Sequence, residues 1–270
     1  MAVAGRTPAG FRLPDYTTFL EYLQLKIERE QYPIDEPVDD SECNGNTFLM
    51  EAVHRADIEA VKYLVAAGAD LDIVTSTTAL ASYNSSMDSS KIIPILRYLL
   101  DNGALFIQDI EDEYTGLMPD ERAKAQLKKY IQNVTTTKQT LDEKTIRNMA
   151  AIYTFLTNEA KSRVFDASIS VVGQNKTPMI LKYDKSIDIR KLKQLIEILY
   201  LKDTVRFDLL MPGAQIGKTK KEINANKTLN VNRTMADYVG SRYNTAPVKL
   251  VVAPKIRSGF GGRRKTLKRR

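Results

Sequence analysis

The sequence predicts a multidomain fold in which an all-helical first half is followed by an α+β domain. Apolar residues recur three and four positions apart up to about residue 161, as they do on the buried faces of helices. From residue 167 onward, short strand-like runs flank one strongly helical stretch. Charge divides the chain similarly, because the residues up to Asp120 include 8 basic and 21 acidic side chains, whereas the rest include 32 basic and 12 acidic. Two domains of opposite charge are therefore expected.

The stretch 44–72, NGNTFLMEAVHRADIEAVKYLVAAGADLD, carries the most specific pattern of the first half. Val61, Leu64 and Val65 are three and four positions apart, so they form one apolar stripe on a helix. Gly68 suits the end of that helix, because glycine adopts a left-handed cap without steric cost. The stretch therefore predicts two short helices joined by a turn.

This stretch resembles one ankyrin repeat, a unit of about 33 residues with a Gly-x-Thr turn, a helix opening with Thr-Pro-Leu-His-x-Ala, a second apolar helix and a Gly-Ala-Asp close. Phe48, Met50 and Ala56 depart from it, because the family has proline, histidine and an inter-helix glycine there. A second copy restarts at 78–80 and closes at 102–104, with about four extra residues between. The matching positions of the first copy are Gly45, Thr47, Leu49, Ala52, Val61, Leu64, Val65, Gly68, Ala69 and Asp70.

Helices outside the repeats are expected to cover their open ends, since one or two repeats cannot bury their apolar faces alone. Thr18 and Glu21 form a capping box that begins the first of these helices, and 120–132 has the pattern of the second. Thr140 and Glu143 form another capping box at the start of a bracing helix. The predicted boundaries are a flexible arm at 1–14, a short ankyrin-repeat solenoid with capping helices at 15–132, and a polar linker with the bracing helix at 133–166.

The domain at 167–254 has the predicted order strand, strand, helix, strand, strand. This order is that of the ubiquitin-like β-grasp family, and the segment 233–238, Arg-Thr-Met-Ala-Asp-Tyr, resembles that family's Arg-Thr-Leu-Ser-Asp-Tyr. The chain differs by an insertion at 217–231 and by the absence of a leucine in the first hairpin. The expected strands are 168–172, 179–183, 205–211 and 248–253, and the helix is 189–199, with Asp188 as its N-cap.

The sequence offers little for catalysis. His54 is the only histidine and Cys43 the only cysteine, and no glycine-rich phosphate loop or metal-ligand spacing occurs. We therefore expect a nonenzymatic protein that needs no cofactor or metal. A single cysteine excludes an internal disulfide, no apolar run reaches the roughly 18 residues of a membrane helix, and the N-terminus lacks a secretion-signal pattern. We expect an intracellular protein of the cytoplasm or nucleus.

The two resemblances imply two binding surfaces. Ankyrin repeats bind protein partners on a concave face made of hairpin tips and first helices, and the ubiquitin-like family keeps an apolar recognition patch on its sheet. A patch of this kind would bind ubiquitin receptors or processing enzymes. The resemblances carry over Glu51, His54, Arg55, Asp72, Val74, Ser82 and Tyr83 for the ankyrin face, with Ser82 and Tyr83 on the second copy's first helix, and Leu210, Lys249 and Val251 for the ubiquitin-like patch.

The last segment, 255–270, holds eight basic residues and no acidic ones, and is predicted to be a disordered tail. Such a tail would attract nucleic-acid phosphates without reading sequence or serve as a nuclear import signal, and a purely solubilising role is an equal alternative. Gly261-Gly262 also resembles the end of a conjugatable modifier awaiting trimming. The candidate contacts are Arg263, Arg264, Lys265, Lys268, Arg269 and Arg270.

The favoured hypothesis is a nonenzymatic protein–protein interaction adaptor, in which the ankyrin module binds a protein and the ubiquitin-like domain presents a second surface. The alternative is a nucleic-acid-associated or virus-particle structural protein that contacts phosphate through its basic C-terminal half. Degenerate repeats and a glycine-spaced basic tail also resemble ankyrin proteins of large DNA viruses, which would add the infected host cell or the virion as locations.

Overall fold

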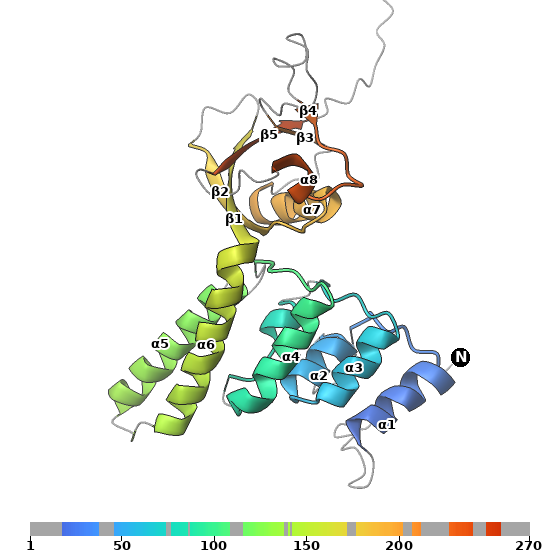
Figure 1. Ribbon diagram of the computed structural model, residues 1–270, viewed down its shortest axis with the longest axis vertical. Helices are drawn as coiled ribbons and strands as arrows, with labels where there is room; N and C mark the ends of the chain where they lie inside the picture. Colours follow the sequence, from blue (N-terminus) through green and yellow to red (C-terminus); the bar gives the residue numbers. More distant parts are fainter. Residues whose placement is uncertain are drawn as a thin grey trace, which may run out of the picture. The chain divides into compact units, whose positions relative to one another are not determined.

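The computed structural model describes residues 18–37, 46–73, 77–85, 87–108, 116–137, 140, 142–171, 177–201, 207–211, 227–239 and 247–254. The chain divides into two compact units. Unit 1 consists of Met1–Phe165 and Lys182–Ile187, and unit 2 consists of Asp166–Leu181 and Asp188–Arg270. Helices make up most of unit 1, whereas unit 2 holds most of a five-stranded sheet (Figure 1). A helical first half followed by an α+β domain is therefore confirmed.

Helix α1 (Phe19–Gln24) begins at the predicted capping box. The Glu21 backbone N–H donates to the Thr18 hydroxyl over 3.2 Å, and the Thr18 N–H donates to the Glu21 carboxylate over 3.0 Å. The helix continues as one π-helical turn, η1 (Leu25–Arg29). Leu23 is fully buried, so α1 belongs to the core of unit 1.

The first repeat consists of α2 (Phe48–His54) and α3 (Ile58–Ala66). Thr47 caps α2 by accepting the Met50 N–H, as the Gly-x-Thr turn predicts. Gly68 follows α3 with a φ of +90°, which confirms the predicted left-handed cap. The helix pair expected at 44–72 is therefore present.

Ala56 stands in the turn between α2 and α3 with a φ of +56°. An alanine in this left-handed region costs roughly 1–2 kcal/mol, and glycine removes that strain but gains about 0.5–1 kcal/mol of conformational freedom in the unfolded chain. We expect Ala56→Gly to raise the free energy of unfolding by up to about 1 kcal/mol, measured by chemical denaturation. The matched change Ala66→Gly, at an exposed site in the last turn of α3, should lower the free energy of unfolding. If Ala56→Gly also lowers the free energy of unfolding, Ala56 is not strained.

The segment predicted as a second repeat contains η2 (Ala79–Ala81), a single 3₁₀ turn, and α4 (Ser89–Asp101). Its first helix is therefore shorter than predicted, and Ser82 and Tyr83 follow it instead of lying on it. The Ser82 hydroxyl donates to the carbonyls of Ala79 and Met50 over 3.0 and 3.3 Å. Such side-chain bonds compete with the helical ladder, so they favour an early end to the turn.

Two longer helices, α5 (Pro119–Thr137) and α6 (Glu143–Arg163), complete unit 1. The predicted linker is shorter than expected, because α5 continues through Thr137. The hydroxyls of Thr135, Thr136 and Thr137 each donate over 2.8 Å to the carbonyl four residues earlier. Because these hydroxyls bond within the helix, they do not pull the backbone into an irregular conformation. The N-cap of α6 is Asp142, not Thr140, since its carboxylate accepts the Lys144 N–H over 3.0 Å.

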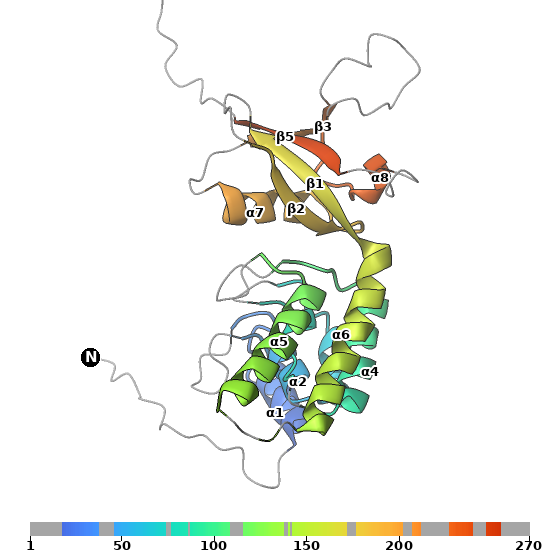
Figure 2. The same cartoon turned by 90° about the vertical axis from the view of Figure 1, so that its left-hand side faces the viewer.

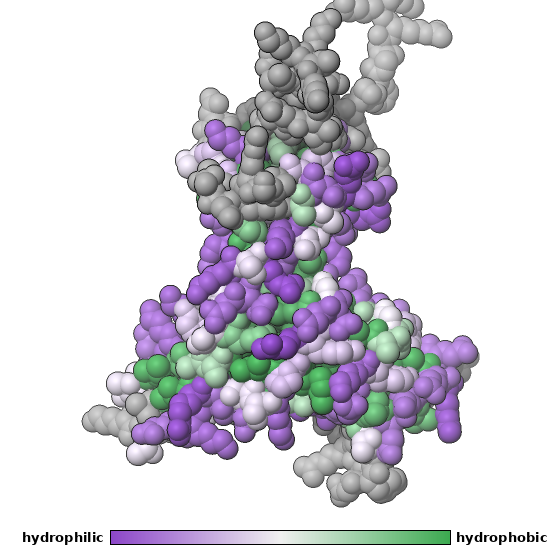
Figure 3. Space-filling view, viewed as in Figure 1, coloured by the Kyte–Doolittle hydropathy of each residue, from purple (hydrophilic) through white to green (hydrophobic). Residues whose placement is uncertain are grey.

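One apolar core joins all these helices. It includes residues of α1 to α4 and η2, together with Ala123 from α5 and Ile152, Leu156 and Ala160 from α6. On the face seen in Figure 3, apolar side chains also reach the surface over the helices of unit 1, among polar ones. The helices α1 to α4 thus share their buried core with α5 and α6.

The sheet has the strand order β2-β1-β5-β3-β4. β1 and β5 are parallel, whereas β3 is antiparallel to both β5 and β4. Helix α7 (Ile189–Tyr200) follows β2 and lies against one face of the sheet (Figure 2), and α8 (Ala236–Val239) precedes β5. Asp188 caps α7 as predicted, through a 2.7 Å bond from the Lys191 N–H. The strands are β1 (Val164–Val171), β2 (Met179–Asp184), β3 (Phe207–Met211), β4 (Lys227–Thr228) and β5 (Val248–Pro254).

Candidate functional site

The residues predicted for the ankyrin face differ in their accessibility. Glu51, Ser82 and Tyr83 are only 5, 8 and 4 % exposed. His54 is exposed at the end of α2, and Arg55, which follows it, is half-buried. The predicted set therefore reaches solvent chiefly through this pair. Asp72 is half-buried and accepts the Leu105 N–H over 2.8 Å, and Val74 lies outside the described residues.

Arg55 is held by two neighbours. Its Nε donates to the Glu51 carboxylate one helical turn earlier, and its guanidinium lies 4.8 Å from the centroid of the Phe19 ring in α1. The buried Glu51 therefore serves to position Arg55, which remains a cation at the surface. The contact with Phe19 also connects this candidate binding residue to the N-terminal cap.

A polar cavity of about 410 Å³ opens beside His54, and we call it the α5 cavity. It lies between the repeats and α5, and it brings together three predicted residues, His54, Ser82 and Tyr83. Two further lining residues come from α5, which the sequence had suggested only as a cap. The described residues that line it are Asn46, His54, Thr77, Ala81, Ser82, Tyr83, Asn84, Ser85, Arg122 and Gln126.

Hydrogen bonds orient the side chains of this cavity. His54 Nδ1 lies 3.3 Å from the Ser82 carbonyl oxygen, so Nδ1 carries a proton and donates. Arg122 Nη1 donates to the Thr77 hydroxyl over 3.3 Å. Gln126 Oε1 is buried without a hydrogen-bond partner among the described residues. The cavity therefore combines fixed donors with an acceptor that the described side chains leave unused.

A second cavity of about 280 Å³ continues along α5. Ser85 and Gln126 line both cavities, so the two adjoin. The second one adds Lys129 from α5 and Thr145 from α6. Its lining is Ser85, Gln126, Lys129, Tyr130, Asn133, Thr145 and Met149. The two cavities are thus neighbours along α5, between the repeats and α6.

The residues predicted for the ubiquitin-like patch occupy neighbouring strands. Leu210 on β3 is paired directly with Val251 on β5, and Lys249 stands two residues before Val251. The alternation of burial along β3 places Leu210 on the face opposite the buried Leu209, so it lies on the open side of the sheet. Lys249 is exposed, while Leu210 and Val251 are half-buried. The three residues therefore share one face.

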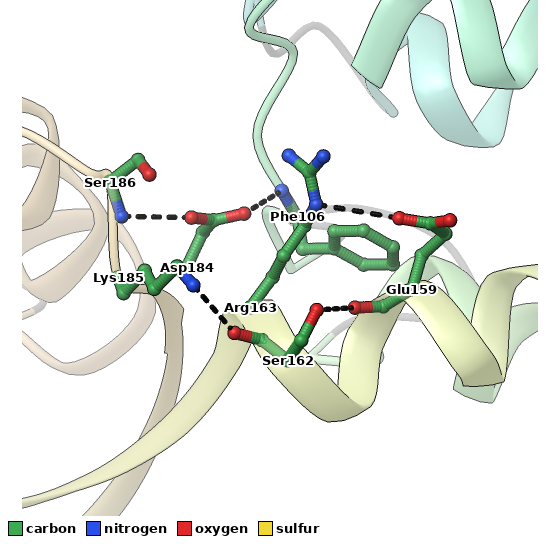
Figure 4. A network of polar contacts seen from close by, with 7 residues as sticks. All are labelled: Phe106, Glu159, Ser162, Arg163, Asp184, Lys185 and Ser186. Carbon is green, nitrogen blue, oxygen red and sulfur yellow. Dashed lines mark hydrogen bonds and ion pairs between the residues drawn. The ribbon is translucent and has the colours of Figure 1, made fainter. Parts of the chain in front are cut away.

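Asp184, at the end of β2, is a fully buried carboxylate that the sequence did not single out. Figure 4 shows it accepting two backbone N–H groups, from Ser186 over 2.8 Å and from Phe106 over 3.3 Å. Burial raises the pKa of Asp184, against the opposing effect of these bonds and of Arg163 and Lys185. With both oxygens engaged by backbone, Asp184 fixes the chain and offers nothing to a substrate.

Several sequence predictions fall outside the described residues, namely Cys43, Gly261-Gly262 and the basic tail 255–270. Within the described ranges, no group of histidine, cysteine, aspartate and glutamate could hold a metal ion. Over those same ranges, no helix is long and apolar enough to cross a membrane.

Comparison with known proteins supports one of the two resemblances. The family model of the ankyrin repeat matches residues 44–76, which contain α2 and α3. Neither a curated protein nor a solved structure matches the chain significantly. The first repeat is therefore confirmed as an ankyrin repeat, and ankyrin repeats in general mediate protein–protein interaction.

Proposed function

We propose that the chain is a nonenzymatic adaptor that binds a protein partner through its ankyrin repeats and presents a second surface on its sheet. The observation that carries this proposal is the ankyrin repeat at 44–76, whose first helix ends at an open polar cavity. Repeat proteins use such faces for recognition. Among the described residues, the lining holds no paired acid and base and no metal-binding group, which favours binding over catalysis.

The partner surface that we propose is centred on His54 and Arg55. Both residues lie at the C-terminal end of α2, His54 beside the α5 cavity and Arg55 beside Phe19 of α1. Both side chains can donate hydrogen bonds to a partner. The buried residues position these two side chains. Glu51 accepts a hydrogen bond from Arg55, the Ser82 carbonyl accepts one from His54, and Tyr83 contributes to the cavity wall. Arginine is enriched among the residues that dominate binding energy in protein interfaces, which favours Arg55.

We further propose that unit 2 is a ubiquitin-like β-grasp domain. Support comes from the order β2-β1-β5-β3-β4, with β1 parallel to β5 and with α7 after β2. The segment 233–238 is also tied into the domain, because the Tyr238 hydroxyl accepts the Asn230 N–H over 2.7 Å and Asp237 accepts the Thr234 N–H over 2.9 Å. The second surface of the adaptor is then the open face around Leu210 and Val251, and its partners are proteins of the ubiquitin pathway.

Affinity capture from a cell lysate by the whole tagged chain, followed by mass spectrometry, tests the adaptor. We expect His54→Ala with Arg55→Ala to remove one set of captured proteins at least tenfold, and Leu210→Ser with Val251→Ser to remove a different set. The control pair Lys62→Ala and Lys91→Ala changes exposed cations of α3 and α4 outside both surfaces and should remove neither. The same proteins captured by all three double variants would refute the adaptor.

The nucleic-acid alternative rests on charge, since the chain beyond Asp120 carries 32 basic and 12 acidic residues. Phosphate contacts release counterions, so capture through them falls steeply as salt rises, by orders of magnitude between about 50 and 200 mM. Captured material that is nucleic acid and is lost in this way would favour the alternative. Proteins retained at the higher salt favour the adaptor.

A further inference from the structure

Gln126 on α5 carries a side-chain amide whose acceptor is unused within the described part of the chain. Its Oε1 is buried and has no hydrogen-bond partner among the described residues. A buried acceptor in this state destabilises the free protein, because it has lost its bond to water and gained none from the fold. The residue as a whole is only half-buried, and it lines both the α5 cavity and the second cavity. A ligand in either cavity can therefore reach this side chain.

The amide of Gln126 can turn toward such a ligand. The last torsion of a glutamine side chain, χ3, has a broad two-fold profile, so its oxygen and nitrogen exchange places at little cost. Because Oε1 has no partner among the described residues, turning it into a cavity breaks no described bond to it. A ligand that donates a hydrogen bond would thus satisfy an acceptor that the fold leaves unpaired.

A primary amide matches the edge of an extended peptide. In a strand, the N–H and the C=O of one residue point to the same side, and an antiparallel neighbour exchanges both hydrogen bonds with them. The Gln126 amide can form the same pair, by accepting the N–H at Oε1 and donating from Nε2 to the carbonyl. A helical segment does not offer these groups, because it bonds them internally. Proline is excluded at the paired position, because it has no N–H.

The two cavities have the size that such a segment needs. The α5 cavity has a volume of about 410 Å³, within the roughly 300–1,000 Å³ of known ligand pockets, and the second cavity adds about 280 Å³. Gln126 and Ser85 line both, so a segment of several residues can occupy the two cavities while its backbone passes Gln126. All described lining residues belong to unit 1.

His54 supplies a second acceptor on the wall of the α5 cavity. Its Nδ1 is already occupied, because it donates to the Ser82 carbonyl over 3.3 Å. In the neutral imidazole, Nε2 is then an acceptor. The bond at Nδ1 also fixes the orientation of the ring, so less entropy is lost when Nε2 accepts a hydrogen bond. A serine or threonine hydroxyl has the donor that this nitrogen needs.

We propose that the α5 cavity and the second cavity bind an extended segment of the partner protein, whose backbone pairs with the Gln126 amide and whose hydroxyl side chain donates to His54 Nε2. This inference rests on the proposed adaptor function, and it names the kind of segment that the ankyrin half recognises. Because the contacts use uncharged donors, binding should persist as salt rises, unlike a contact with phosphate.

The single histidine allows a direct test on the full chain. With histidine labelled by ¹⁵N, the imidazole signals belong to His54 alone. The probe is a blocked hexapeptide of alternating serine and alanine, and its counterpart is the oligoester with the same side chains, in which an ester oxygen replaces every N–H. We expect saturable shifts with the peptide, larger at Nε2 than at Nδ1, and roughly tenfold weaker binding of the oligoester.

The variant Gln126→Leu separates binding from folding. Leucine keeps a side chain of similar size and removes the amide, so the peptide should bind roughly tenfold more weakly. The same change removes an unpaired buried acceptor, so the midpoint of urea denaturation should rise. The matched control Gln132→Leu changes an exposed glutamine of the same helix. It should leave binding within about twofold and the midpoint unchanged.

Equal binding of the peptide and the oligoester would overturn the proposal, and this comparison does not depend on the folding of any variant. Weaker binding by Gln126→Leu together with a lower midpoint would also overturn it, because Gln126 would then support the fold. Capture that is lost with His54→Ala and Arg55→Ala, together with no response to the peptide, would refute this inference and leave the adaptor standing. Capture that no variant affects would refute the adaptor itself.

Discussion

Leu156→Ala is expected to lower the free energy of unfolding of unit 1 by about 2–5 kcal/mol, the usual cost of emptying a buried leucine site. Leu156 lies on α6 and is fully buried in the same core as the ankyrin helices α2, α3 and α4. Two repeats have little core of their own, so a cavity in α6 should loosen them as well. Hydrogen exchange of the full chain, followed by mass spectrometry, should show faster exchange in α3 peptides than in the unsubstituted protein.

The matched control is Ile131→Ala on α5, where the side chain is 38 % exposed. This change removes a similar aliphatic group without opening a buried cavity, so its effect should stay within about 1 kcal/mol. If Leu156→Ala speeds exchange in α6 but not in α3, then α6 is not part of the cooperative unit of the repeats. The proposed role of α6 in supporting the repeats would then be wrong.

Local patterns account for what the sequence could predict. The capping residues Thr18, Thr47 and Asp188 act within three residues of themselves, so their roles can be read from spacing. Gly68 is also a local signal, because the left-handed conformation that it adopts belongs to one residue. The first repeat was predictable for the same reason, since its two helices are adjacent in the chain and each carries its own apolar stripe.

Contacts between distant segments account for what the sequence missed. The approach of α5 to the repeats brings Arg122 and Gln126 into a cavity with His54, and nothing in the local pattern of α5 indicates this. Likewise, the 3₁₀ turn η2 ends where the Ser82 hydroxyl reaches the carbonyl of Met50, 32 residues earlier. The burial of Tyr83 follows from that same neighbourhood. A prediction that took Ser82 and Tyr83 as residues of a regular helix could not include it.

Asp184 is the strongest case of this kind, because its Oδ2 accepts the N–H of Phe106, 78 residues away. We expect Asp184→Ala to lower the free energy of unfolding by about 2–4 kcal/mol, since two backbone N–H groups lose their acceptor and each costs about 1–3 kcal/mol when buried unpaired. Urea denaturation of the full chain would measure this loss. Asp184→Asn keeps one acceptor oxygen at the same site, so it should cost less than the alanine variant. Equal losses would mean that the asparagine amide does not replace the lost acceptor, so that both bonds require the carboxylate.

The dependence on pH separates the charge of Asp184 from its hydrogen bonds. Burial raises its pKa above the ordinary 3.8, so between these two pKa values the folded chain keeps a proton that the unfolded chain has released. The stability of the wild-type chain relative to Asp184→Asn should therefore be greatest in acid, fall as pH rises through this interval, and be flat above it. Asp88 and Asp142, whose pKa values are lowered by hydrogen bonds, give the opposite trend in both proteins and cancel in the difference. A difference that rises with pH would mean that Arg163 and Lys185 outweigh burial.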